Sequence, residues 1–137
     1  MKSFRQIFLI LTIILSLGVF AEVSSRDVAI ARAKAVFIVT ANGDVAKLKQ
    51  LMTPEFYREN YPYSDSRVRE ILLGVPTEKR KSLIHQIQNQ CTPSTVKNRA
   101  GDVITVTLIN KVTKKEITVQ LIDEDETGNW KVFNYWY

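Results

Sequence analysis

The sequence predicts an α+β domain in which N-terminal helices pack on a curved antiparallel β-meander. Two observations lead to this prediction. Over residues 25–91 the apolar side chains recur at helical spacing, and after Pro93 the hydrophobic period becomes two. The β-branched segments that follow are joined by connections too short for a crossover, so they should pair as antiparallel neighbours. Helices followed by a meander is the element order of an α+β fold.

The first 21 residues have the pattern of a secretory signal. Lys2 and Arg5 precede an almost unbroken apolar run at residues 7–20, and Val19 and Ala21 are small residues that a signal peptidase accepts. A spanning helix needs about 20 apolar residues, and this run is shorter. We therefore expect cleavage near Ala21, with an uncleaved membrane anchor as the alternative.

Cleavage would give a signal peptide at residues 1–21 and a single domain at residues 22–137, exported to the periplasm or the extracellular medium and without a stable membrane span. The chain has 19 Lys and Arg against 14 Asp and Glu, and the signal contains two of the cations, so the domain has a net charge of +3. This mild, dispersed charge argues against a nucleic-acid partner. The run at residues 78–81 is interpreted as a solvated helix face, and weak contact with anionic lipid or cell-wall polymer is the alternative.

Cys91 is the only cysteine, which excludes a disulfide within one chain. A domain of this size can bury roughly two thirds of its unfolded surface, so its core suffices without one. Cys91 continues an apolar helical stripe with Leu83, Ile84 and Ile87. We therefore expect it to be buried as a small hydrophobe, with pairing to another chain as the alternative.

The helical half is divided by residues that start or stop helices. Asn42 and Gly43 form a stop signal, because both tolerate the left-handed conformation. Asp44 and Thr53 are capping residues, and Pro54 follows Thr53 at the favoured first helical position. The expected helices begin after Ser24 or Ser25 as a cap, at Val45, at Pro54, at Asp65 or Ser66, and after Thr77 as a cap.

The strand half should contain segments 95–99, 103–110, 116–123 and 130–137. Strict alternation places Trp130, Val132, Asn134 and Trp136 on one face of the last strand, and Lys131, Phe133, Tyr135 and Tyr137 on the other. Aromatic residues on both faces imply that both need a cover. The helices supply one cover, and a second copy of the chain is a common source of the other.

Several short motifs carry a family resemblance. A Gly43-Asp44 step follows the first helix and precedes a helix with Leu48 and Leu51, and Gly128-Asn129-Trp130-Lys131-Val132 opens the last strand. The chain resembles the nuclear transport factor 2-like superfamily of cone-shaped, cystatin-like domains, in particular its small secreted bacterial members of unknown function. Enzymes of that superfamily place carboxylates, histidine or tyrosine in a cone between helix and sheet. The fold alone does not decide among enzymes, ligand binders and assembly modules.

The polar residues give little support to catalysis. His85 is the only histidine, lies among glutamines and lacks a carboxylate at helical spacing, so we expect it on the surface and not in a dehydratase pair. A zinc site would need more ligands than His85 and Cys91. The acidic run at residues 123–126 is interpreted as a solvated turn, with loose cation binding as the alternative. We predict no catalytic residue, metal site or cofactor.

The aromatic residues are the remaining candidates for function. They divide into a ligand-pocket set, Phe37, Phe56, Tyr57, Trp130 and Tyr135, and an interface set, Phe133, Trp136 and Tyr137. We expect an exported, non-enzymatic binding or interaction domain that uses a cone pocket or the open sheet face. Its partner would be a small apolar ligand, an envelope protein or a second copy in a homodimer. The alternatives are a small isomerase- or dehydratase-like enzyme of the cone fold, and an immunity or assembly partner.

Overall fold

The computed structural model of the chain describes residues 25–99 and 102–137. The expected signal peptide, residues 1–21, lies outside the described residues. Within the described part of the chain, no helix combines the length and the apolar character that crossing a membrane requires.

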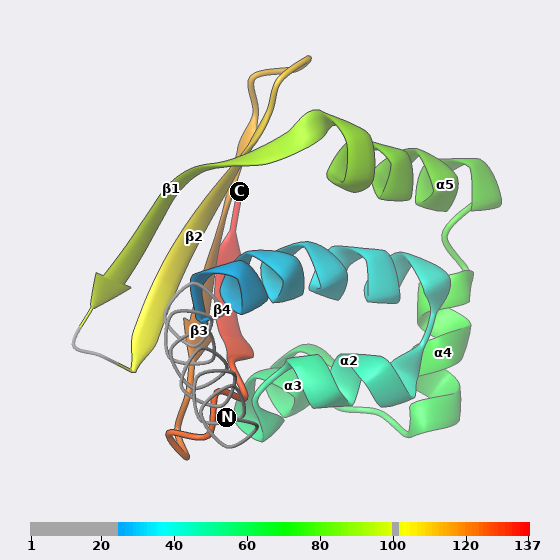
Figure 1. Ribbon diagram of the computed structural model, residues 1–137. Helices are drawn as coiled ribbons and strands as arrows, with labels where there is room; N and C mark the ends of the chain where they lie inside the picture. The colour runs from blue at the N-terminus through cyan, green and yellow to red at the C-terminus, as the bar shows by residue number, and fades with distance from the viewer. Residues whose placement is uncertain (1–24, 100–101) are drawn as a thin grey trace, which may run out of the picture.

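The described residues form a layer of helices followed by a four-stranded antiparallel sheet in the order β1-β2-β3-β4, which confirms the α+β class (Figure 1). The helical segments are the long helix at residues 25–42, α2 (Val45–Leu51), α3 (Pro54–Asn60), α4 (Asp65–Leu73), α5 (Thr77–His85) and the π-helical turn η1 (Gln86–Gln90). The strands are β1 (Cys91–Arg99), β2 (Val103–Asn110), β3 (Glu116–Ile122) and β4 (Lys131–Trp136). In Figure 1 the long helix lies beside the sheet, with α5 on one flank and α2 and α3 on the other.

The predicted caps fix the starts of the short helices. The long helix ends at Gly43, which has a φ of +67°. The Asp44 carboxylate accepts a hydrogen bond from the backbone N–H of Lys47 at 3.2 Å, and α2 begins at the next residue. The Thr53 hydroxyl accepts one from the N–H of Phe56 at 3.3 Å and so caps α3. These side chains satisfy N–H groups that have no partner within the first turn.

Helix α5 starts without the expected Thr77 cap. Pro76 occupies the cap position and Thr77 is the first helical residue. The Thr77 hydroxyl instead accepts a hydrogen bond from Arg80 at 3.2 Å. Arg80 also donates to the carbonyl of Val75 at 2.9 Å and to that of Ala41 at 3.3 Å. Its guanidinium therefore ties the turn before α5 to the end of the long helix.

Cys91 is buried, as predicted, but in a strand and not in a helix. Its side chain is 5% exposed, and burial raises the pKa of its thiol. The helical stripe ends in η1, and β1 begins at Cys91, before the expected start at Thr95. Pro93 is tolerated inside β1 because β1 is an edge strand, and the pairing with β2 shifts between Pro93 and Thr95.

The core lies between the helices and one face of the sheet. The long helix contributes Ala29, Ala33 and Val36, each 1% exposed or less. Every second residue of β2 is buried, from Ile104 to Asn110, as period-two alternation predicts. Burial continues into the second half of the long helix, where Val36, Phe37 and Val39 are buried, in agreement with its nearly continuous apolar sequence.

The last strand contains a β-bulge that the sequence does not reveal. Val132 pairs with Leu121 on β3, and Asn134 pairs with Gln120, the adjacent residue. Two steps along β4 therefore correspond to one step along β3, and Phe133 is the additional residue.

The bulge reverses which residues of β4 face the helices. Tyr135 pairs with the buried Val119 and lies on the helix-facing side together with Val132, whereas Trp136 pairs with Thr118 on the opposite side. The expectation that Val132 and Trp136 share a face is therefore wrong. Period-two alternation assumes that successive residues point to opposite faces of the sheet. One inserted residue therefore moves the side chains that follow it to the other face.

The last strand is joined directly to the helical half. Met52 and Val132 form an isolated parallel bridge, and the backbone N–H of Thr53 donates to the carbonyl of Val132 at 2.9 Å. Arg32, on the long helix, donates to the carbonyl of Trp130 at 2.7 Å. The helices and the C-terminal strand are thus held together by backbone and side-chain hydrogen bonds.

Candidate functional site

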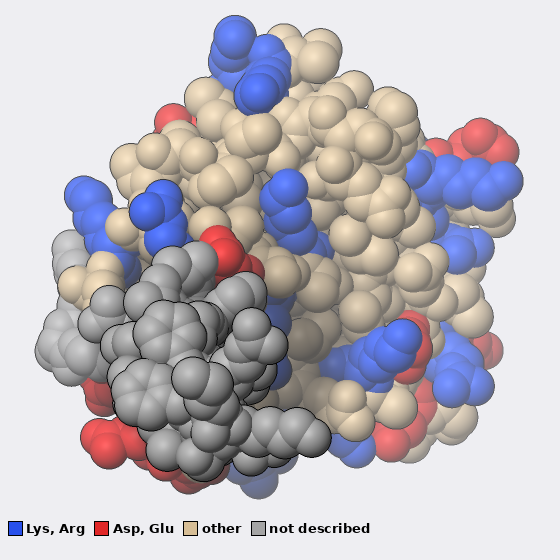
Figure 2. All heavy atoms as spheres, viewed as in Figure 1, with Lys and Arg blue, Asp and Glu red and all other residues tan. Residues whose placement is uncertain are grey.

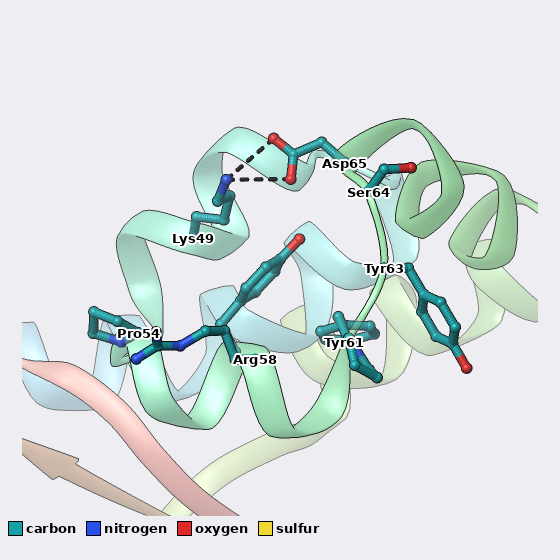
Figure 3. A pocket seen from close by; sticks show the side chains of 9 residues that line it. Lys49, Pro54, Arg58, Tyr61, Tyr63, Ser64 and Asp65 are labelled. Carbon is teal, nitrogen blue, oxygen red and sulfur yellow. Dashed lines mark hydrogen bonds and ion pairs between the residues drawn. The ribbon is translucent and has the colours of Figure 1, made fainter.

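A groove of about 600 Å³ lies between α2, α3 and the start of α4 (Figure 3). We call it the tyrosine groove and define it by its lining residues: Lys49, Pro54, Tyr57, Arg58, Tyr61, Pro62, Tyr63, Ser64 and Asp65. Helix starts position this lining. Pro54 begins α3, so Tyr57 and Tyr61 follow one turn apart on one side, and Ser64 caps α4. The groove therefore depends on three separate elements.

Tyr57 is the most unusual residue of the groove. Its side chain is 7% exposed, and its buried hydroxyl has no hydrogen-bond partner among the described residues. Burial raises the pKa of this hydroxyl above 10.0, the carboxylate of Asp65 adds to the rise, and the ammonium of Lys49 opposes it. The phenol is therefore neutral near pH 7 and able to donate a hydrogen bond. A buried polar group without a partner costs about 1–3 kcal/mol, so a ligand or water that accepts this hydrogen bond would be stabilising.

An ion pair lies beside Tyr57. The Nζ of Lys49 is 3.2 Å and 3.1 Å from the two carboxylate oxygens of Asp65, so the pair links α2 to the start of α4 (Figure 3). The same Nζ is 5.7 Å from the centroid of the Tyr57 ring. The two charged side chains are 48% and 61% exposed. Exposed pairs of this kind contribute about 0–1 kcal/mol, so this one can be displaced at little cost.

Arg58 is a cation of the groove without a charged partner. It is exposed, and it has no ion pair or hydrogen bond from its side chain to any other described residue. Figure 3 shows its side chain extending beside Pro54. Because Lys49 is neutralised by Asp65, Arg58 gives the groove a local charge of one positive unit.

Aromatic rings form the apolar surface of the groove. The centroids of Tyr57 and Tyr61 are 5.5 Å apart, with an angle of 41° between the ring planes. Tyr61 is half-buried and Tyr63 is 56% exposed, so the rings form a gradient from the core to the solvent. Tyrosine faces of this kind bind flat apolar groups.

Of the predicted pocket residues, only Tyr57 lines the groove. Phe37 and Phe56 instead contact Tyr135, with centroids 5.4 Å and 5.5 Å from the centroid of its ring. Burial raises the pKa of Tyr135 to about 12. Trp130 is 4% exposed and makes none of these ring contacts. The structure thus gathers Phe37, Phe56 and Tyr135 into one aromatic cluster against the core, separate from the groove.

The charged residues of the groove were not selected from the sequence. Lys49, Arg58 and Asp65 lie on three different elements, and only the tertiary packing brings them together. A local signal exists for the rings, because Tyr57, Tyr61 and Tyr63 fall within seven residues beside Pro62. Spacing alone could not distinguish this group from a core helix and its loop.

The predicted interface residues differ in exposure. Phe133 is half-buried, Trp136 is 45% exposed and Tyr137 is 83% exposed. Trp136 ends a cross-strand row on the sheet face that points away from the helices: Thr95, Thr107, Thr118 and Trp136. The hydroxyls of Thr107 and Thr118 lie 3.2 Å apart within this row.

The polar residues considered in the sequence lie on the surface or stabilise turns. His85 is exposed on α5, as predicted, and its Nδ1 lies 3.1 Å from the side-chain amide nitrogen of Asn89. Asp123 is buried and accepts hydrogen bonds from the backbone N–H groups of Thr127 at 3.2 Å and Gly128 at 2.9 Å, so it stabilises the turn before β4. The described residues contain no group of three or more His, Cys, Asp or Glu suited to hold a metal ion.

The basic run at residues 78–81 is largely exposed on α5, which contains no buried residue. Figure 2 shows one face of the molecule, on which the Lys and Arg side chains are scattered and separated by uncharged groups. The described residues on this face therefore form no continuous basic patch.

Comparisons of the chain with protein-family models, with curated proteins and with solved structures find no match.

Proposed function

We propose that the protein is an exported, non-enzymatic binding domain that holds a small ligand in the tyrosine groove. The observation that carries the proposal is the buried Tyr57 hydroxyl, which lacks a partner in the wall of a groove with the volume of a small-molecule site. Export, to the periplasm or the medium, is supported by the sequence of residues 1–21. The order of helices and strands supports the proposed nuclear transport factor 2-like relationship.

Acid–base catalysis is less well supported than binding. The groove does contain a tyrosine near a carboxylate, which is the minimal set for an isomerase- or dehydratase-like reaction. The Asp65 carboxylate, however, is more than half exposed and paired with Lys49, so it is not held in a dry site facing a substrate. The raised pKa of Tyr57 makes this residue a hydrogen-bond donor and not a base.

Screening a library of small aromatic fragments by amide NMR tests the groove. We expect the chemical-shift changes to gather on residues 49–65, because the tyrosine rings provide the stacking surface. Tyr63→Ala should weaken the fragments that bind, by about threefold to tenfold, since it removes one exposed ring. Trp136→Ala is the matched control, because it removes an exposed aromatic side chain from the sheet. Shift changes confined to β4, or equal losses in both variants, would contradict the proposal.

The sheet face is a second candidate, as a homodimer interface or as a surface for an envelope, immunity or assembly partner. The observation that favours it is the exposed Trp136 at the end of the threonine row. Val103, Ile109 and Ile122 add half-buried aliphatic side chains to this face. Large aromatic residues surrounded by smaller side chains are typical of interface centres.

Light scattering after gel filtration tests the homodimer. We expect the exported protein to have a dimer mass at high micromolar concentration. Trp136→Ala should raise the dissociation constant of the dimer about tenfold and so favour the monomer. Val112→Ala serves as the control, because Val112 is 70% exposed in the β2–β3 turn and off the sheet face. A monomer mass for the unsubstituted protein at that concentration would rule out the dimer.

A further inference from the structure

We infer that the ligand of the tyrosine groove is a small aryl carboxylic acid, with its carboxylate on Arg58 and the Tyr57 hydroxyl and its ring stacked on the tyrosines. This inference rests on the proposed function, because it specifies the ligand of the same groove. Three features of the groove lead to it: its unbalanced charge, its unsatisfied donor and the shape of its apolar wall.

The charge of the groove selects an anion. Lys49 and Asp65 neutralise each other at 3.1 Å, which leaves Arg58 as the unbalanced group. A guanidinium binds a carboxylate through two parallel hydrogen bonds, a geometry that neutral amides and alcohols cannot match. A cationic ligand would be repelled by the same residue.

The hydrogen-bonding state of Tyr57 selects an acceptor. Its hydroxyl is protonated near pH 7 and has no acceptor among the described residues. A carboxylate oxygen supplies the missing acceptor, whereas an ammonium group supplies only donors. The hydroxyl has almost no solvent exposure, so a ligand reaches it only if neighbouring side chains move, and the Lys49–Asp65 pair lies beside this residue, with the Nζ of Lys49 5.7 Å from the ring centroid. The exposure of that pair makes its displacement inexpensive.

The wall of the groove selects a flat apolar body. Tyr57 and Tyr61 present tilted rings at 5.5 Å, and Tyr63, Pro54 and Pro62 complete the surface. A volume of about 600 Å³ is within the range of sites that hold a ligand of one to three rings. An aromatic ring gains more from these faces than an aliphatic chain of similar area, because offset and edge-to-face contacts add to burial.

Calorimetry with three naphthalene probes tests the ligand class. The probes are 2-naphthoate, 2-naphthamide and 2-naphthylmethylamine, which share one ring system and differ in charge. We expect the acid to bind about tenfold more tightly than the amide and the amine to bind most weakly. Equal affinities for acid and amide, or a preference for the amine, would overturn the ligand class. Either result would leave the proposal that the groove binds a ligand unaffected.

Substitutions then test which side chains contact the carboxylate of the bound acid. Arg58→Gln should weaken naphthoate about tenfold and leave naphthamide unchanged, while Arg67→Gln, outside the groove on α4, should change neither. Tyr57→Phe should weaken naphthoate about fivefold without lowering the melting temperature, since it removes a hydroxyl that has no partner in the free protein.

Asp65→Asn provides a test in the opposite direction. It frees Lys49 and removes a competing carboxylate, so naphthoate should bind about threefold more tightly. A general loss of structure cannot produce this gain. Naphthoate binding that is insensitive to Arg58→Gln and Asp65→Asn would overturn the inference. The proposal that the groove binds a ligand fails on a different result, namely chemical-shift changes from the fragment screen that do not map to residues 49–65.

Discussion

Replacing Leu121 with alanine is expected to lower the free energy of unfolding by about 3–4 kcal/mol, which is the largest effect we predict for a single side chain. Leu121 is fully buried near the end of β3, where it pairs with Ile104 on β2 and Val132 on β4. Truncation removes its burial and leaves a cavity that two neighbouring strands cannot close by moving, because both are fixed by ladder hydrogen bonds.

The matched control for Leu121→Ala is Ile122→Ala. Ile122 is the next residue of the same strand and an aliphatic side chain of equal size, but it points to the outer face and is half-buried. We expect a loss of about 1 kcal/mol there. Urea unfolding of both variants, with the slope of the transition unchanged, measures the difference. Equal losses would show that the two faces of the sheet are covered to the same extent, contrary to the structure.

Replacing Gly43 with alanine is expected to cost about 2 kcal/mol. Two terms contribute to this loss. Gly43 has a φ of +67°, where a Cβ is strained, and a Cβ built there would lie 2.7 Å from Cδ2 of Leu73. The turn between the long helix and α2 must then change its backbone, or Leu73 at the end of α4 must move.

Gly128→Ala separates the two terms of the Gly43 prediction. Gly128 has a φ of +81°, but no heavy atom lies within 4 Å of a Cβ built there. The strain alone should cost about 1 kcal/mol at this position. In a Leu73→Ala background the cost of Gly43→Ala should fall to that of Gly128→Ala. Thermal or urea unfolding measures all of these, and an unchanged cost in that background would show that the contact with Leu73 contributes nothing.

The parts of the fold that depend on local chemistry were predictable from the sequence. Asp44, Thr53 and Pro54 start their helices where expected, because capping involves residues a few positions apart. Strand β2 has the predicted bounds, Val103–Asn110, since its β-branched residues lie between two turns.

The parts that depend on partners were not predictable. The bulge at Phe133 arises from the pairing of β4 with β3, and nothing in the sequence of β4 marks it. Strand β1 begins at Cys91 because pairing with β2 extends past Pro93, which a rule based on one strand treats as a break.

The tyrosine groove shows the same division between local and tertiary information. Its rings fall in a short segment, and Tyr57 was selected from the sequence as a pocket residue. Lys49 and Asp65 meet only when α2 and α4 are packed, so their effect on the Tyr57 hydroxyl could not be read from spacing.

The bonds between the helical half and β4 have a consequence for the order of events in the cell. Thr53 and Arg32 donate hydrogen bonds to the carbonyls of Val132 and Trp130, so the helices cannot dock completely until these two residues have been synthesised. If the chain is exported, as we propose, the contacts between the helices and β4 are completed only after β4 has crossed the membrane.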